Sequence, residues 1–189
     1  MKSDREKWDD IYAHEESPNH PSAVVEEFHR LAKRGTALDI AAGNGRNAKY
    51  LAEKGFVVDA VDISAVGLQL VGNGNPDVRP IRQDLDFCIL QQNRYDLVVT
   101  VNYLNRRLFP FILDSLKSGG FLIYQTFLWD RSSPPRKREP LSDHYLRPNE
   151  LLHSFLALHI HRYTETKSKK PKGTKTMVAT LVGEKRWAS

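Results

Sequence analysis

Two aspartates frame a short glycine-rich segment that could bind a cationic or hydroxyl-bearing ligand. Asp39 lies just before AGNGRN, residues 42–47, and Asp62 follows the glycines by about 20 residues. Glycine adopts positive φ and carries no Cβ, so Gly43 and Gly45 let a ligand approach the backbone closely. Carboxylates accept hydrogen bonds from ammonium groups and from sugar hydroxyls. The spacing therefore indicates a site for a nucleoside-containing ligand.

The glycines alone leave the ligand open. Gly43, Gly45 and Ala48 satisfy the dinucleotide pattern G-x-G-x-x-G/A, and Asp62 stands where that pattern has its ribose-binding acid. A nicotinamide enzyme is therefore one hypothesis. Asp39 argues against it, because a carboxylate beside the turn would repel pyrophosphate in a partly dry crevice. The ammonium and sulfonium groups of S-adenosylmethionine suit this carboxylate better, although both aspartates could instead be turn-forming or helix-capping residues.

The elements that must position these residues alternate along the chain. Apolar runs predict strands, and helix-spaced segments between most of them predict helices. The expected strands are 37–41, 56–61, 78–83, 95–101 and 120–127, and the expected helices are 45–54, 64–71 and 105–117, the last ending at SGG. This alternation predicts a parallel sheet with helices on both faces, which binds ligands beyond the carboxyl ends of its strands.

The two ends of the chain add helices and a hairpin. A helix is expected around 7–12, and a second one follows the break SPNHPS and reaches Lys33. After the fifth strand come a loop over 128–147 and a helix opened by Pro148. Two further β segments, 157–166 and 175–184, predict an antiparallel hairpin.

Length and composition predict one soluble domain. The chain has 189 residues, of which 40% are hydrophobic and 27% charged, as in ordinary globular proteins. We expect a single domain over 1–189, with a helical cap (1–34), a cofactor-binding core (35–127) and a substrate-side region (128–189). No secretory signal or membrane span is visible, and the single cysteine excludes an internal disulfide framework, so a cytoplasmic location is expected.

The basic residues bear on possible partners. The net charge is +5, and lysine and arginine gather at 131–138 and 167–175. Such segments could contact the phosphates of nucleic acid, but no aromatic side chains interleave with them to stack on bases, and solvated loops are the simpler interpretation. His159 and His161 share a strand face without further ligands in register, so no metal site is predicted.

The stretch LDIAAGNGRNAKYLAEKGFVVDAVDIS resembles motif I and its successor in class I S-adenosylmethionine-dependent methyltransferases, and GRNAKYLAEKGF is similar to the small tellurite-resistance type. Five more segments fall in the family's order: EKWDDIYA, DVRPIRQDLDF, YDLVVTVNYL, LKSGGFLIYQTF and YLRPNELLHSF. The resemblance implies an α/β fold, with a Rossmann-like, doubly wound, mostly parallel sheet of seven strands that ends in a C-terminal antiparallel β-hairpin.

The resemblance also implies a site for S-adenosylmethionine, released as S-adenosylhomocysteine. Asp39 would organise the turn and hold the methionine end with the backbone of Ala41 and Gly43, although the family usually has glycine at position 41. Gly45 would begin the next helix. The expected cofactor-binding residues are Trp8, Tyr12, Asp39, Ala41, Gly43, Gly45, Arg46, Asp62, Ile63, Asp84, Leu85 and Asn102.

The remaining cofactor contacts would come from the ends of the next three strands. Asp62 would bind the ribose, with Ile63 against the adenine. Asp84 and Leu85 would border the adenine ring. Asn102 would lie beside the methionine portion and the methyl group.

The residues that bind the methyl acceptor are harder to identify from the sequence, because methyl transfer needs an aligned nucleophile more than a strong base. Trp8 and Tyr12, four apart on a helix, could form a lid over the cofactor or fasten that helix to the core. Tyr103, His144 and Arg147 are the candidate catalytic residues. Tyr103 could equally be a core aromatic, and His144 could be a solvated loop residue or a proton acceptor at neutral pH.

The acceptor expected from the sequence is a small molecule. The fourth strand ends VNYL, without the Asn-Pro-Pro-Tyr that embraces an exocyclic amine, and Cys88 follows phenylalanine and not proline. Methylation of nucleic-acid bases is therefore disfavoured. An RNA-directed methyltransferase, an NAD-dependent oxidoreductase and a cofactor-binding module without catalysis remain as alternatives.

Overall fold

A seven-stranded sheet forms the centre of the protein. The structure is a computed structural model that describes residues 4–14, 18–71, 75–129, 144–169 and 175–186. Within these residues the strand order is β3-β2-β1-β4-β5-β7-β6. The strands are β1 (Thr36–Ile40), β2 (Val57–Asp62), β3 (Val78–Arg82), β4 (Tyr95–Val101), β5 (Leu116–Phe127), β6 (His159–Lys169) and β7 (Lys175–Glu184).

The pairing confirms the expected fold. The first five strands pair in parallel, whereas β7 runs antiparallel to both β5 and β6, so the last two strands form the predicted hairpin. The strand order reverses between β1 and β4, where a doubly wound sheet leaves a crevice for a ligand. The turn after β1 therefore lies at the position from which such folds bind their ligands.

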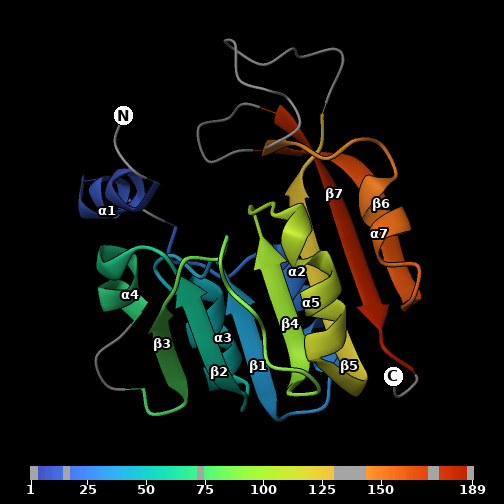
Figure 1. The fold of residues 1–189 in the computed structure, drawn as a ribbon, viewed down its shortest axis with the longest axis horizontal. Helices are drawn as coiled ribbons and strands as arrows, with labels where there is room; N and C mark the ends of the chain where they lie inside the picture. The colour runs from blue at the N-terminus through green and yellow to red at the C-terminus, as the bar shows by residue number, and fades with distance from the viewer. Residues whose placement is uncertain (1–3, 15–17, 72–74, 130–143, 170–174, 187–189) are drawn as a thin grey trace.

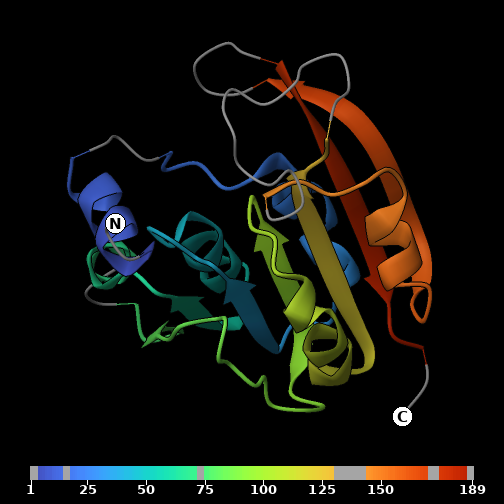
Figure 2. The same cartoon turned by 45° about the horizontal axis from the view of Figure 1, so that its top comes forward.

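Helices cover both faces of the sheet (Figures 1 and 2). The helices are α1 (Asp4–His14), α2 (Ala23–Phe28), α3 (Arg46–Glu53), α4 (Ala65–Val71), α5 (Phe109–Ser115) and α7 (Glu150–Ser154), with 3-10 turns η1 (His29–Leu31) and η2 (Arg106–Leu108). Side chains of α2, α3 and α4 enter one core cluster, and those of α5 and α7 enter the other. None of these helices is both long and apolar enough to cross a membrane.

The central strands are apolar on both sides because both sides are covered. In β4, Leu97 and Val99 face the core under α2, α3 and α4, while Val98 faces the core under α5 and α7. Near-continuous apolar runs are typical of parallel strands buried in this way. The helix α1 stands apart from both layers and packs on α4, at the end of the molecule to which the carboxyl ends of β1 to β5 point (Figure 1).

The predicted end of the helix over 105–117 is wrong. Helix α5 ends at Ser115, and β5 begins at once with Leu116, which pairs with Tyr95 before the register shifts. The SGG segment therefore lies inside the strand, where Gly119 has a φ of 78°. A glycine with positive φ serves a β-bulge as well as a helix end, so the glycines alone did not decide between them.

The helix after the long loop also begins later than predicted. Its first residue is Glu150, and Asn149 at the N-cap position has a φ of 61°, so Pro148 lies outside the helix. Most of the loop over 128–147, including the basic segment 131–138, lies outside the described residues.

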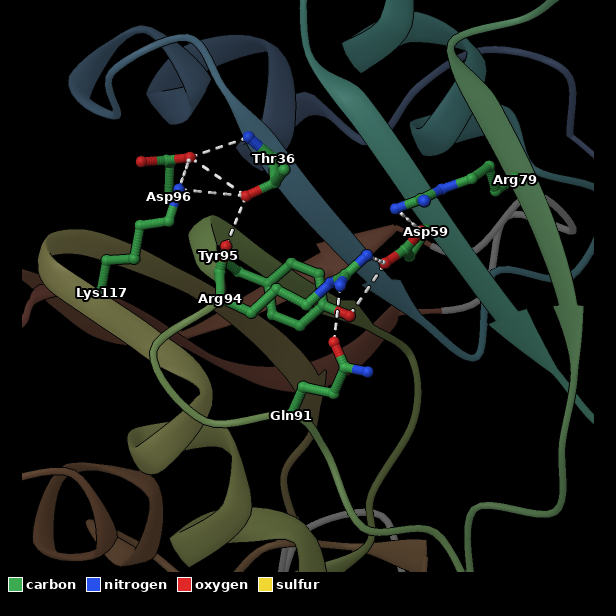
Figure 3. A network of polar contacts seen from close by, with 8 residues as sticks. All are labelled: Thr36, Asp59, Arg79, Gln91, Arg94, Tyr95, Asp96 and Lys117. Carbon is green, nitrogen blue, oxygen red and sulfur yellow. Dashed lines mark hydrogen bonds and ion pairs between the residues drawn. The ribbon is translucent and has the colours of Figure 1, made fainter.

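A polar network packs beneath the connection from β3 to β4, which forms no helix over residues 83–94 (Figure 3). Asp59 of β2 is only 2% exposed. Its Oδ1 lies 2.6 Å from Arg79 Nη2, and its Oδ2 lies 3.1 Å from Arg94 Nη2 and accepts a 3.0 Å hydrogen bond from the Tyr95 hydroxyl. The charge of this buried carboxylate is therefore matched by two guanidinium groups.

Candidate functional site

The turn after β1 has a left-handed backbone at three positions. The φ angles are 56° at Ala41, 58° at Gly43 and 72° at Gly45. Glycine adopts such angles freely, whereas an L-residue with a Cβ is strained by roughly 1–2 kcal/mol. The turn is held by a hydrogen bond from Ala42 N to Val61 O, at 3.0 Å. Glycine, which the family usually has at position 41, would adopt this backbone conformation without strain. Ala41 adopts it with strain.

Gly45 serves the packing of two helices. It is the N-cap residue of α3, as predicted for the start of this helix, and a Cβ at this position would lie 2.8 Å from Val71 Cγ2 of α4. Any side chain here would push the two helices apart. The glycine therefore allows the amino end of α3 to lie close to α4 behind the turn.

Asp39 is a buried acid with one carboxylate oxygen that receives no hydrogen bond from the described residues. Its side chain lies in β1 and is 1% exposed, and no hydrogen-bond partner for Oδ2 occurs among the described residues. The backbone N–H of Ala48 donates to the carboxylate. Burial raises the pKa of Asp39 to about 7, against the opposing effect of the Arg46 guanidinium and with a small contribution from Asp62. This carboxylate lacks the compensation that buried charges normally receive.

Asp62 joins the end of β2 to the glycine turn. Its Oδ2 accepts a hydrogen bond of 2.8 Å from Gly43 N, and its Oδ1 accepts one of 2.8 Å from Ser64 N. Burial raises the pKa of this carboxyl, and the backbone N–H donors oppose that rise. A carboxylate has about four lone-pair sites, so these two bonds leave capacity for ligand hydroxyls.

Tyr12 covers the turn from the side of α1. A Cβ on Gly43 would overlap the Tyr12 hydroxyl, and a Cβ on Gly67 of α4 would lie 2.9 Å from Tyr12 Cδ2. Both glycines thus make room for the tyrosine ring. Trp8 stacks on Tyr12 with ring centroids 6.0 Å apart and remains 41% exposed. The two aromatic rings therefore share one face of α1, as predicted, and the inner ring lies on the turn.

Arg46 follows Gly45 as the first residue of α3 and is partly buried. Its Nη1 donates to the backbone oxygen of His20 at 3.3 Å. Burial lowers the pKa of the guanidinium, while the negative charge of Asp39 raises it. The site thus combines a buried anion with a partly buried cation beside one tight turn.

The other predicted cofactor residues lie at the ends of neighbouring strands. Ile63 is half-buried after β2, and Asp84 is exposed after β3. Leu85 is 5% exposed and packs in the core under α5 and α7, so its side chain offers little surface to a ligand. Asn102 follows β4 with a φ of 61°, and its N–H donates to Gln125 O at 2.8 Å. The sheet therefore brings these segments to the same edge as Asp62.

The candidate catalytic residues come from two segments. Tyr103 is half-buried after β4, and its hydroxyl accepts a hydrogen bond of 3.3 Å from Asn105 Nδ2. Burial raises the pKa of Tyr103 to about 12, so the phenol stays neutral and suits a hydrogen-bond donor better than a base. His144 and Arg147 are exposed before α7, and the backbone N–H of Arg147 donates to Glu150 Oε2 at 2.8 Å.

An ion pair between these two segments was missed by the sequence analysis. Arg106 Nε lies 2.5 Å from Glu150 Oε1, and Arg106 Nη2 lies 2.9 Å from Glu150 Oε2. The same Nη2 donates to the backbone oxygen of Tyr145 at 3.0 Å. This bidentate pair fastens η2, after β4, to the start of α7. The partners are 44 residues apart, so no local spacing could have indicated the contact.

Asp9 and Ser64 were also missed, and they connect α1 to the site. Asp9 Oδ1 accepts a hydrogen bond of 2.6 Å from the Ser64 hydroxyl. A signal was present, because Asp9 lies in EKWDDIYA three residues before Tyr12 and therefore on the same side of a helix. Its partner at the end of β2 could not be inferred from that spacing.

Solved structures with the same fold include three of interest. TehB from Haemophilus influenzae has a TM-score of 0.77 and 17% identity, over 94% of this chain and 67% of its own. Geranyl diphosphate C-methyltransferase from Streptomyces coelicolor A3(2), in complex with S-adenosyl-L-homocysteine, has a TM-score of 0.65 and 16% identity, over 86% and 77%. The [4+2]-cyclase SpnF has a TM-score of 0.69 and 15% identity, over 95% and 81%. At such identities these likenesses concern the fold.

The sequence itself identifies the family. No curated protein matches this chain significantly. A family model described as a methyltransferase domain matches residues 12–167, which include the glycine turn, Asp39, Asp62 and the segments around Tyr103 and α7. This confirms the family inferred from the resemblance. The chain belongs to the methyltransferase-domain family.

Proposed function

We propose that the protein transfers a methyl group from S-adenosylmethionine to a small-molecule acceptor. The observation that carries the proposal concerns Asp39, a 1% exposed carboxyl beside the glycine turn. Its Oδ2 has no hydrogen-bond partner among the described residues. An unpaired carboxylate in such a place is costly unless a ligand completes it. A cation with an N–H donor completes it, whereas a pyrophosphate would add a second negative charge.

The charges around the turn fit a zwitterionic amino acid. Asp39 would accept from the ammonium group of the methionine portion. Arg46, partly buried at the start of α3, would face the carboxylate. Asp62 has free lone pairs for the two ribose hydroxyls, and its bond to Gly43 N keeps it beside the turn. The ammonium group and the carboxylate of the methionine portion would thus each face a side chain of opposite charge.

When bound, S-adenosylmethionine supplies an electrophilic methyl carbon and a thioether leaving group for an in-line displacement. The residues of this chain have to align the acceptor and exclude water, and positioning of this kind supplies much of the acceleration. Tyr12 would cover the cofactor from α1. The Arg106–Glu150 pair would keep the segments that carry Tyr103 and Arg147 at a fixed spacing.

We assign Tyr103, His144 and Arg147 to the acceptor. Tyr103, kept neutral by its raised pKa, would orient the acceptor through its hydroxyl. His144 would receive a proton where the acceptor loses one, and Arg147 would attract an anionic group. A small acceptor is supported by the absence from the sequence of the Asn-Pro-Pro-Tyr and Pro-Cys motifs that base methylation uses.

Calorimetry with the purified protein tests the cofactor. We expect micromolar binding of S-adenosylmethionine and S-adenosylhomocysteine and none of NADH. Asp62→Ala should lose this binding, and Asp62→Asn, which keeps the shape of the side chain, should weaken it. Asp77→Asn, at an exposed carboxylate before β3, is the matched control and should bind like the parent protein. Binding of NADH without either S-adenosyl compound would overturn the proposal in favour of an oxidoreductase.

Label transfer tests the acceptor. Methyl-labelled cofactor should be incubated with thiols, amines, carboxylates, phenols and oxyanions, and in a separate arm with RNA at low salt. Transfer to a small molecule, reduced in Tyr103→Phe, is the expected result. Transfer to RNA alone would replace the small-molecule acceptor with a nucleic acid.

A further inference from the structure

We propose that Asp9 is a positioning residue that couples the docking of α1 to cofactor binding, through Ser64 and Asp62. The proposal rests on the proposed function for the identity of the ligand. The docking itself rests on contacts between described residues. Asp9 needs no contact with the cofactor to act in this way.

The first step of the connection is a shared hydrogen-bond site at the start of α4. Asp9 Oδ1 accepts 2.6 Å from the Ser64 hydroxyl and 3.2 Å from Val66 N. The Ser64 hydroxyl oxygen in turn accepts 2.9 Å from Gly67 N. Free backbone N–H groups at a helix start favour a carboxylate, so Asp9 caps α4 from a different helix.

The second step reaches the glycine turn. Ser64 N donates to Asp62 Oδ1, and Asp62 Oδ2 accepts from Gly43 N, each at 2.8 Å. Four residues therefore form one chain of hydrogen bonds from α1 to the turn: Asp9, Ser64, Asp62 and Gly43. A displacement of Asp9 would be transmitted to the carboxylate that is proposed to bind the ribose.

Helix α1 needs contacts with the rest of the protein to stay in place. It has 11 residues, none of them buried, and a helix of this length is marginal in water by itself. It lies beyond the two helical layers, over α4 (Figures 1 and 2). The Ser64 hydroxyl lowers the pKa of Asp9, so the charged form that makes these bonds is favoured.

Docking through Asp9 also sets the position of Tyr12. The two side chains are three residues apart and lie on the same side of the helix. Tyr12 fits between Gly43 and Gly67, and Gly67 N is bonded to the same Ser64 hydroxyl that binds Asp9. With Asp9 released, the ring would lose its fixed place over the turn, although Tyr12 itself is unchanged.

Hydrogen exchange of the ligand-free protein tests the docking. Amides of residues 8–14, which have acceptors within the helix, should exchange slowly in the parent protein and at least tenfold faster in Asp9→Ala. Asp9→Asn keeps an oxygen acceptor for Ser64 and Val66 N and should restore most of the protection. Asp4→Ala, an exposed acid on the same helix, is the matched control and should change little. Unchanged exchange in Asp9→Ala would overturn the proposal.

Affinity for S-adenosylhomocysteine tests the coupling. Asp9→Ala should raise Kd about tenfold, Asp9→Asn less than threefold, and Asp4→Ala not measurably, while the urea midpoint of the core stays the same. Because Asp9 acts in part through Tyr12, its substitution should cost much less in a Tyr12→Ala background than alone. Unchanged affinity in Asp9→Ala would contradict the coupling. Failure of the parent protein to bind the ligand would refute the proposed function, and the exchange experiment would still decide the docking.

Discussion

Two buried aspartates on neighbouring strands differ in how their charges are treated. Asp39 of β1 is 1% exposed and Asp59 of β2 is 2% exposed. Asp59 faces Arg79, Arg94 and the Tyr95 hydroxyl (Figure 3). The carboxylate of Asp39 accepts a hydrogen bond from the backbone N–H of Ala48, and its Oδ2 has no hydrogen-bond partner among the described residues. Equal burial therefore accompanies opposite degrees of compensation.

The difference follows the position of each residue along its strand. Asp59 lies in the middle of β2, beneath a connection without a helix, where paired polar groups take the place of a covering helix. Asp39 lies next to the end of β1, at the reversal of strand order where doubly wound sheets bind ligands. A buried carboxylate whose charge is paired with arginines indicates structure, and one without an ion pair at such an edge indicates a ligand.

The largest effect is expected from Asp39→Asn. Burial raises the pKa of Asp39 from 3.8 to about 7, so the charged form is disfavoured in the folded state. The contribution of Asp39 to the free energy of unfolding is complete below the pKa of the unfolded chain. It falls as the pH rises to the pKa of the folded protein. At 1.36 kcal/mol per unit, the loss at pH 8 is at most about 4 kcal/mol.

Asparagine removes this loss because it carries no charge. Urea unfolding should therefore show Asp39→Asn to be more stable than the parent protein at pH 8 and little changed at pH 4, while its affinity for the proposed cofactor falls at least tenfold. A variant that is less stable at pH 8 and binds normally would show that Asp39 is structural.

The opposite result is expected at Asp59. Asp59→Ala leaves Arg94 and the Tyr95 hydroxyl without their buried acceptor, and breaking such a pair costs about 3 kcal/mol. Arg79 is 50% exposed and can turn to water, which keeps the loss at the lower end of that range. The urea midpoint should fall, and affinity for S-adenosylhomocysteine should stay within threefold. A stabilised Asp59→Ala protein would remove the contrast between the two aspartates.

A smaller effect sharpens the account of the turn. Ala41→Gly should stabilise the protein by about 1 kcal/mol, because glycine adopts the φ of 56° without strain. Ala42→Gly is the matched control at a position without positive φ, and it should destabilise by about 0.5–1 kcal/mol. Thermal unfolding of the two variants gives the comparison. Destabilisation by both would mean that the backbone at Ala41 carries no strain.

The fold could be predicted because its signals are repeated. Alternation of apolar runs and helix-spaced segments located the first five strands, and β1 to β4 were placed to within about a residue. The two β segments of the tail located the hairpin. The helix before β5 was given the wrong end because SGG is compatible with two structures, and Leu116 enters the sheet early. The pairing of Leu116 with Tyr95 makes this segment a strand, and such pairing is a property of the tertiary structure.

The site was predictable only where it follows a strand end. Asp39 and Asp62 were chosen because they frame the glycine turn at the carboxyl ends of two strands, and their role in cofactor binding stays a prediction. The contact of Asp9 with Ser64 and the pairing of Arg106 with Glu150 join segments that are distant in sequence. Nothing in the spacing of these residues indicates their partners, so only the structure could reveal them.

The most direct measurement is the ionisation of Asp39, followed by the carbon-13 shift of its carboxyl carbon with and without S-adenosylhomocysteine. We expect a pKa of about 7 in the free protein and a clearly lower value in the complex, because a bound ammonium group stabilises the charged form. A pKa that is ordinary in the free protein, or that stays the same or rises when the ligand binds, would contradict the view of Asp39 as the receptor for a cation.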